Sequence, residues 1–215
     1  MGISFFIVNF AKILAKISKI RTMTKKHDII WFDEVDSTNN EAARHISELD
    51  NLSVLSARRQ FSGRGQRDHV WISEDGKNLT FSVVLKYNTP GAPENPSYLR
   101  PFIAKNQAII SDTTVSSVLE LLHRHNIEGS IKLPNDILIG DKKICGILIE
   151  HVVKGMYLTY SIVGIGLNVN QRDFDITLPD ATSIALLKDN TKDPAHDELD
   201  LATCLEGFMG IFTRA

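Results

Sequence analysis

Cysteine is scarce in this 215-residue chain, and neither sign of charge is in large excess. Cys145 and Cys204 stand far apart with no CxxC pattern, which argues against a disulfide framework or a zinc site and predicts two small buried hydrophobic residues. The formal net charge is −2, so composition gives no support to a general nucleic-acid binder, and any anion site has to be local. We expect one globular domain of ordinary size in the cytoplasm.

Acidic residues are absent from the first 26 positions, which carry six lysines or arginines. Apolar residues recur there at helical spacing, and lysines interrupt them before the about 20 apolar residues of a transmembrane helix accumulate. The clean apolar core of a secretory signal is also missing. Three interpretations stay open: an amphipathic helix on a surface, a partner-binding helix, or a stretch upstream of a natural start at Met23. We therefore separate an N-terminal extension, 1–26, from the domain, 27–215.

Alternating apolar residues and turn signals predict an α+β fold. We expect strands at 27–34, 53–58, 79–87, 130–133, 137–139, 144–153 and 156–169. We expect helices that begin at 38 and that span 98–125, 181–188 and 199–214. Thr38 and Glu41 have the spacing of a capping box. Because hairpins are frequent and strands outnumber helices, the sheet should be mixed but largely antiparallel, flanked by helices.

A loop rich in glycine and arginine occupies Ser62–Trp71, between two predicted strands. Glycines let a ligand approach the backbone closely, and arginines neutralise phosphate or carboxylate. The loop matches neither the GxxxxGK[ST] pattern of a P-loop nor a GxGxxG fingerprint. Taken alone, it is as compatible with a solvated basic turn as with an anion site.

Three further patches follow along the chain. Lys132–Asp136 begins with a lysine that closes an apolar strand, where burial is expected unless the side chain snorkels to the surface. Asp141–Glu150 is compatible with a plain charged hairpin in which Gly146 forms a bulge. Gly164–Asn170 places two glycines in an apolar strand, which predicts that another group approaches its backbone.

In their order and intervals, these patches resemble the catalytic domain of biotin protein ligases. The family pattern reads approximately DSTN, GRGRxGRxW, KWPND, KKxxGILxE, GIGxNVN and ATSL. This chain has DSTN from Asp36, GRGQRDHVW from Gly63, KLPND from Lys132, KKICGILIE from Lys142, GIGLNVN from Gly164 and ATSI from Ala181. The resemblance covers about residues 28–188, and the ordered set is far more specific than any single patch.

The resemblance implies an ATP-dependent biotin–protein ligase. Biotin and MgATP would form biotinyl-AMP, and a lysine of a biotin carboxyl carrier protein would then accept the biotin. The oligomeric state stays open, with a homodimer as one possibility. No nucleic-acid partner is expected, since no helix-turn-helix fits before the first strand. Two alternatives stay open: a lipoate- or octanoate-type acyl ligase or transferase of the same superfamily, and a non-catalytic biotin or adenylate sensor.

The resemblance also assigns roles to individual residues. The catalytic residues would be Lys132 and Arg67. The biotin-binding residues would be Ser37, Thr38, Asn39, Gln60, Arg64, Gly65, Gln66 and Lys132. The nucleotide-binding residues would be Arg64, Arg67, Trp71, Asn135, Lys143, Gly146 and Asn168. No protein ligand for a metal is assigned.

Several positions depart from the family pattern. Gln66 stands in place of a second loop arginine, Asp68 in place of a glycine, and His69 in place of a further arginine, so the loop carries less positive charge. Leu133 replaces a tryptophan, which predicts the loss of an aromatic wall from the biotin pocket. We also expect the small C-terminal β domain of the family to be missing, since the chain stops at Ala215.

Overall fold

The structure is a computed structural model that describes residues 28–66, 69–134, 136–188 and 198–214. Within these ranges one seven-stranded sheet has the order β1-β2-β3-β7-β6-β5-β4. The strands are β1 (Ile29–Val35), β2 (Val54–Gln60), β3 (Leu79–Lys86), β4 (Ser130–Lys132), β5 (Asp136–Ile139), β6 (Lys142–Lys154) and β7 (Tyr157–Leu167). The β1–β2 pair is parallel and the other neighbouring pairs are antiparallel, which confirms the predicted mixed sheet. The predicted extension 1–26 lies outside the described residues, as do Arg67, Asp68 and Asn135.

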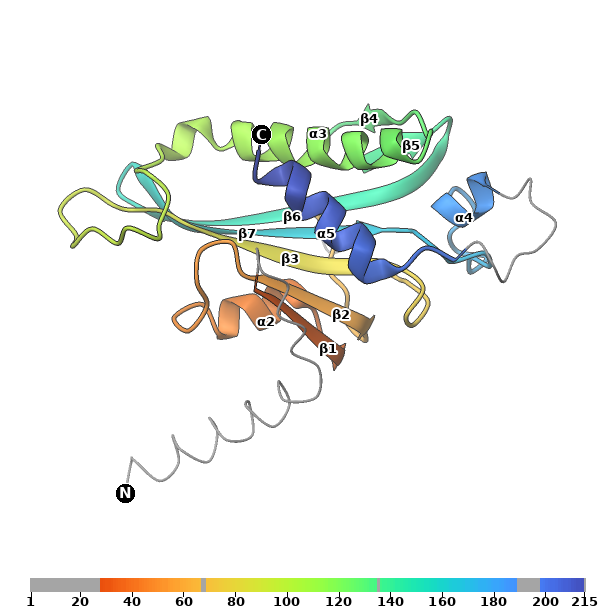
Figure 1. The fold of residues 1–215 in the computed structure, drawn as a ribbon, viewed down its shortest axis with the longest axis horizontal. Coiled ribbons are helices and arrows are strands. Elements are labelled where there is room, and N and C mark those ends of the chain that lie inside the picture. Colours follow the sequence, from red (N-terminus) through yellow and green to blue (C-terminus); the bar gives the residue numbers. More distant parts are fainter. Residues whose placement is uncertain (1–27, 67–68, 135, 189–197, 215) are drawn as a thin grey trace, which may run out of the picture.

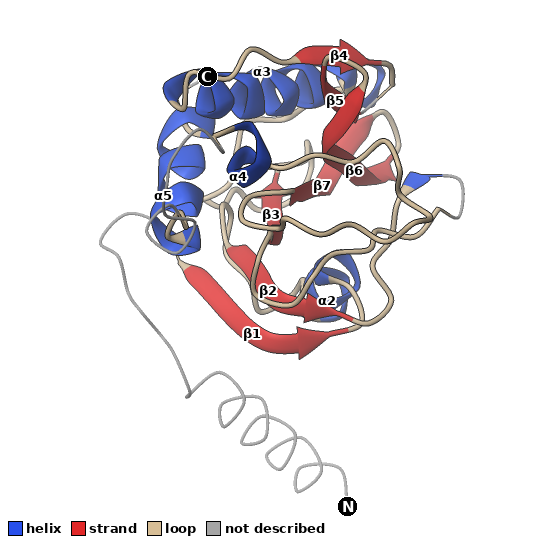
Figure 2. Cartoon of the chain, turned by 90° about the vertical axis from the view of Figure 1, so that its right-hand side faces the viewer, coloured by secondary structure: helices blue, strands red, loops and turns tan. Residues whose placement is uncertain are grey.

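Helices cover both faces of the sheet. They are α2 (Thr38–Arg44), the 3-10 turn η2 (Ala104–Asn106), α3 (Ala108–Arg124), α4 (Ile184–Leu187) and α5 (Leu201–Phe212). Figures 1 and 2 show α3 and α5 side by side on one face, with α2 on the opposite face. The sheet is therefore the middle layer. The helix α2 is short, so it leaves part of its face of the sheet available to a ligand.

The central strand β3 is buried along its whole length, because side chains of a strand alternate between its two faces. Phe81 and Val83 belong to the large core beneath α3 and α5, where the Phe81 ring meets that of Phe208 at 5.2 Å. Val84 points the other way, into a small core with Ala42 of α2. The predicted alternation is thus confirmed, and both faces are buried.

The structure corrects two expectations about helices. The long helix begins at Ala108, whereas we expected it from Tyr98. Proline disfavours helical backbone in the residue before it, and Pro101 lies in the segment that stays extended. Leu99 and Phe102 instead pair through their backbones with the neighbouring strands β3 and β7.

The capping box is also wrong. Ser37 is the N-cap residue of α2, and its side chain makes no capping hydrogen bond. The first helical N–H, that of Thr38, donates to Gln60 Oε1 at 2.8 Å, and Glu41 pairs with Arg44 of the same helix. The side chain of Gln60, from the next strand, therefore caps the helix N-terminus in place of a residue of the helix itself.

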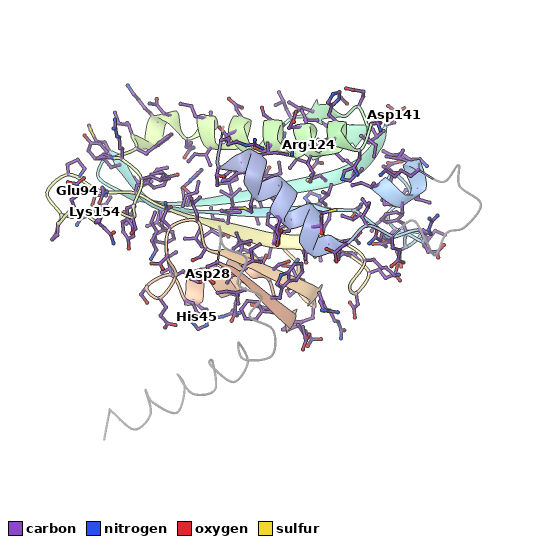
Figure 3. All side chains as sticks on the ribbon, viewed as in Figure 1. Asp28, His45, Glu94, Arg124, Asp141 and Lys154 are labelled. Carbon is purple, nitrogen blue, oxygen red and sulfur yellow. The ribbon has the colours of Figure 1, made fainter. Side chains whose placement is uncertain are left out.

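Charged residues of both signs are spread over the outside of the molecule. Asp28, Glu94, Arg124, Asp141 and Lys154 are all exposed, and Figure 3 shows that Glu94 and Lys154 lie at the opposite end of the molecule from Asp141. Both cysteines are free thiols and buried, as expected. Among the described helices, none combines the length and the apolar character needed to cross a membrane.

Candidate functional site

A cavity of about 460 Å³ opens on the α2 face of the sheet. Its lining comes from the start of α2, described residues of the loop 62–71, the β4–β5 connection, the first half of β6 and the C-terminal end of β7. The lining residues are Ser37, Thr38, Asn39, Gln60, Arg64, Gly65, Gln66, His69, Val70, Trp71, Lys132, Pro134, Asp136, Lys143, Gly146, Ile147, Leu148, Gly164, Ile165, Gly166 and Leu178. Segments far apart in the sequence therefore converge on one site of a size that suits a small molecule.

Strand alternation explains the floor of the cavity. Val163 and Ile165 of β7 belong to the core beneath α3 and α5. Gly164 and Gly166, one position along, consequently face the cavity side. Because the strand order runs from β2 through β3, β7, β6 and β5 to β4, the lining crosses most of the sheet. Five strand spacings correspond to roughly 24 Å, so the site favours an elongated ligand.

The end of the cavity near α2 is polar, and its side chains are largely buried. Ser37, Thr38 and Asn39 are each less than 5% exposed. The Ser82 hydroxyl lies 2.8 Å from Thr38 Oγ1 and 2.6 Å from Asn39 Oδ1. Buried polar groups have to be paired, and here they pair mainly with one another. This end can therefore present fixed donors and acceptors to a polar ring.

Asn39 explains why β7 has glycine at position 164. A Cβ atom on Gly164 would lie 2.3 Å from Asn39 Oδ1, so only glycine leaves room for that side chain. Asn39 Nδ2 also donates to Glu150 Oε2 at 2.8 Å and to the Leu148 carbonyl at 3.3 Å. Asn39 thus shapes the polar end and lines the cavity, and its predicted direct contact with biotin stays a prediction.

Trp71 explains the second glycine. A Cβ atom on Gly166 would lie 2.3 Å from the indole, and one on Gly146 would lie 3.1 Å from it. The prediction that another group approaches the backbone of this strand is confirmed, and the groups are Asn39 and Trp71. The alternative of a bulge at Gly146 is wrong, because the irregular pairing lies at Ile137 and Leu138. The indole Nε1 is buried without a partner among the described residues.

Two of the cations in the lining are neutralised by the protein. The Arg64 guanidinium donates to Glu150 Oε1 at 2.8 Å and to Asn40 Oδ1 at 2.8 Å. Lys143 Nζ lies 2.7 Å from Asp136 Oδ1 and 5.7 Å from the centroid of the Trp71 ring. Both cations are thus held in place by acceptors that the ligand does not supply.

Lys132 differs from these cations. It lies on β4 at the edge of the sheet, and no ion-pair partner is found for it within the described part of the chain. The side chain is exposed, so the expectation of a buried lysine is wrong, although the lysine does line the cavity. An uncompensated ammonium group beside a cavity attracts the anionic part of a ligand.

Some predicted site residues lie elsewhere. Asn168 is buried outside the lining, where its Nδ2 donates to the Thr182 carbonyl at 2.9 Å and its Oδ1 has no described partner. The Asn168 amide thus fastens the end of β7 to the segment that leads to α4. Leu133 is 84% exposed and forms no wall of the cavity. Arg67 and Asn135 cannot be placed, since they fall outside the described residues.

Other residues of the site escaped the sequence interpretation. Asp136 and Glu150 both lie within the patches that we singled out, and a search for acidic partners of the basic residues would have found them. Leu178 follows the last strand and carried no signal, because its approach depends on the path of the chain after β7.

Acidic residues around the site serve mainly as partners for cations. Asp36, next to the lining, accepts hydrogen bonds from Arg44 and Asn40 of α2. The hydrogen bond from Arg44 is the largest cause that holds the pKa of Asp36 well below its ordinary value. Among the described residues, no three His, Cys, Asp or Glu side chains gather in a way that could hold a metal ion.

Comparison with known proteins gives a consistent result. Residues 31–168 match the model of the biotin/lipoate A/B protein ligase family. The chain is 30% identical over 193 residues to the bifunctional ligase/repressor BirA of Bacillus subtilis, which covers 87% of this chain and 55% of that protein. It is 31% identical over 134 residues to the biotin–[acetyl-CoA-carboxylase] ligase of Paracoccus denitrificans, which covers 62% of this chain and 51% of that protein. The chain thus spans about half the length of both relatives.

A solved structure shares the fold. The biotin protein ligase from Aquifex aeolicus, in complex with biotin and ATP, superimposes with a TM-score of 0.62 at 27% identity. The likeness covers 86% of this chain and 68% of that chain.

Proposed function

The chain belongs to the biotin/lipoate A/B protein ligase family, and from that premise we propose that it activates biotin with ATP and transfers it to a lysine of a carrier protein. The observation that carries the proposal is Lys132. It lines an elongated cavity whose opposite end is polar, and it is not neutralised by any described side chain. A site with hydrogen-bonding groups at one end and an available cation at the other suits an acid that must be activated at its carboxylate.

In the first half of the reaction, the ureido ring of biotin would lie among Ser37, Thr38 and Gln60. The carboxylate would point toward Lys132. One carboxylate oxygen attacks the α-phosphorus of ATP, and the bond from that phosphorus to the bridging oxygen breaks to release pyrophosphate. Lys132 offsets the negative charge that collects as the carboxylate and phosphate meet.

The second half of the reaction needs the carrier. A neutral lysine amine of the carrier attacks the acyl carbon of biotinyl-AMP, an amide bond forms, and AMP leaves with the former carboxylate oxygen. The proton that the amine loses passes to solvent or to a nearby base. Gly65 and Gln66 line the cavity, and they would shield the adenylate from water.

The nucleotide would occupy the region of Trp71, Lys143 and Gly146. The charge of Lys143 is already paired with Asp136, so its attraction for a phosphate is reduced. We therefore assign Lys143 a weaker role in nucleotide binding than Lys132. Magnesium would enter with ATP, because Mg²⁺ is commonly bound through substrate phosphates. The carrier would be a biotin carboxyl carrier protein in the cytoplasm. The name of the Paracoccus denitrificans relative gives acetyl-CoA-carboxylase as the acceptor of that protein.

A lipoate- or octanoate-type activity is the rival within the family. An extended acyl chain needs an apolar slot, whereas the α2 end of this cavity is lined by Ser37, Thr38 and Gln60. The polar end therefore favours biotin.

Replacement of Lys132 tests the assignment. Lys132→Ala should lower biotin-dependent pyrophosphate release by about 100-fold, as expected for loss of one transition-state donor. Lys154→Ala, which removes an exposed lysine at the far end of β6, is the matched control and should leave the rate unchanged. A Lys132→Ala enzyme within about threefold of wild type, far short of a donor effect, would rule out this role.

A further inference from the structure

Glu150, in the middle of β6, lies outside the cavity lining while its carboxylate holds two residues of that lining. It accepts hydrogen bonds from both terminal nitrogens of Arg64, at 2.8 and 3.2 Å. It also accepts one from Asn39 Nδ2 at 2.8 Å. A single carboxylate therefore connects the loop 62–71 to the buried start of α2.

The Asn39 side of this connection is rigid. Asn39 is 3% exposed, and its amide also contacts Ser82 at 2.6 Å and the Leu148 carbonyl at 3.3 Å. The amide lies directly against the Gly164 backbone, where a Cβ atom would be only 2.3 Å from Oδ1. Glu150 is thus a fixed acceptor, because one of its oxygens is bound to a group that is itself locked in place.

Arg64, on the other side of the connection, belongs to the loop 62–71. Most backbone hydrogen bonds in the centre of this loop join one residue of the loop to another. The Gly65 N–H donates to the His69 carbonyl at 2.7 Å, and the Trp71 N–H donates to the Gly63 carbonyl at 3.0 Å. These bonds fold the loop onto itself without joining its centre to the sheet. In the described part of the loop, Arg64 reaches Glu150 and Asn40, and the Trp71 indole rests on Gly166.

We propose that Glu150 is a positioning residue that anchors the loop through Arg64, so that Gly65 and Gln66 stand over the cavity before any ligand arrives. Charge-assisted, bidentate pairing of Arg64 with a fixed carboxylate gives the loop one preferred position. Only the identity of the ligand rests on the proposed function. Preorganisation lowers the ordering cost of binding, so losing the anchor weakens binding more than it slows the chemical step.

The loop can be followed without any ligand. The chain has two tryptophans, Trp31 and Trp71, so Trp31→Phe leaves Trp71 as the only reporter. In that background, Glu150→Gln should increase acrylamide quenching of Trp71. It should also accelerate tryptic cleavage after Arg64 about fivefold, which is the effect of losing a partly exposed ion pair. Glu120→Gln, which breaks the Glu120–Arg124 pair on the surface of α3, is the matched control and should change neither readout.

Arg64→Ala provides a second variant, since removing an exposed loop side chain leaves the core intact. It should increase quenching as much as Glu150→Gln does. The double variant should add nothing further, because both substitutions remove the same contact. The proposal is overturned if Glu150→Gln leaves Trp71 unchanged, or if the double variant shows the sum of two separate effects.

Kinetics gives the functional readout. Glu150→Gln should raise the KM for biotin about tenfold while kcat changes by less than about twofold, the signature of lost binding rather than lost chemistry. A fall in kcat with an unchanged KM would contradict the positioning role. If the wild-type chain activates no acid at all, the proposed function fails, whereas the quenching and proteolysis results still decide whether Glu150 anchors the loop.

Discussion

Two acidic residues outside the cavity lining hold the groups around it. Glu150 accepts hydrogen bonds from Arg64 and Asn39 of the lining, and Asp36 accepts hydrogen bonds from Arg44 and Asn40 of α2. The motif pattern predicted most of the lining residues by position. It did not show that Arg64 is already paired with a protein partner, because Glu150 lies 86 positions away in the sequence.

Asp36 supplies a pH-dependent contribution to stability. The pKa of its carboxyl in the folded protein is held well below the ordinary value of 3.8, chiefly by the hydrogen bond from Arg44. The stabilisation is fully present above the unfolded-state pKa and is lost as the pH falls toward the folded-state pKa. Asp36→Asn should therefore lower the free energy of unfolding by about 1 kcal/mol at pH 7 for this partly exposed pair.

Urea unfolding at a series of pH values checks this prediction. The difference between wild type and Asp36→Asn should shrink as the pH falls below about 4, since the wild-type carboxyl then loses its advantage over the unfolded chain. A difference that stays constant down to pH 2 would show that the Arg44 pair does not stabilise the fold.

At the scale of elements, sequence patterns predicted the strands well because their period reflects burial. They failed where a distant element competes with local signals. Residues 98–103 have helical spacing, yet they form backbone hydrogen bonds with β3 and β7. The glycines of β7 could be recognised as sites of close approach, although only the structure shows that Asn39 and Trp71 are the groups that approach.

Substitution of Gly166 tests whether the Trp71 indole lies against the glycines of β6 and β7. Gly166→Ala would place a Cβ atom 2.3 Å from the Trp71 indole, so the ring has to leave its position. Overpacking of this kind costs about 1–3 kcal/mol. We expect a lower melting temperature and a shift in Trp71 fluorescence.

Gly210→Ala is the matched control. Among the described residues, no atom outside its own helix lies within 4 Å of the added Cβ, and Gly210 lies inside α5. Alanine there should stabilise the protein by about 0.5–1 kcal/mol, the usual gain within a helix. Unchanged Trp71 fluorescence in Gly166→Ala would mean that the indole does not lie against these glycines.

At the scale of the whole molecule, composition and hairpin frequency predicted the fold class but not the strand order. Neighbours such as β3 and β7 are about 80 residues apart, and no local pattern specifies such pairings. The position of the cavity follows from that order, because the loop after β2 has to reach β6 and β7. The family resemblance carried this information, whereas periodicity alone could not.

The acid-free segment at the N-terminus should be dispensable for chemistry. It contributes none of the motifs, and the first described strand begins at Ile29. A protein begun at Met23 should therefore activate biotin at the full-length rate and melt at the same temperature. If the segment packs on the domain instead, truncation would expose apolar surface at about 25 cal/mol per Å². A drop in the melting temperature of several degrees would reveal that packing.

Acid-dependent release of pyrophosphate from ATP tests the central claim most directly. With the purified chain, ATP and Mg²⁺, biotin should release pyrophosphate and yield biotinyl-AMP, whereas lipoate and octanoate at the same concentration should not. A chain that binds biotin without releasing pyrophosphate would be a sensor, and one that prefers lipoate or octanoate would be the rival ligase. Either result would contradict the proposal that Lys132 and the polar end of the cavity together activate biotin.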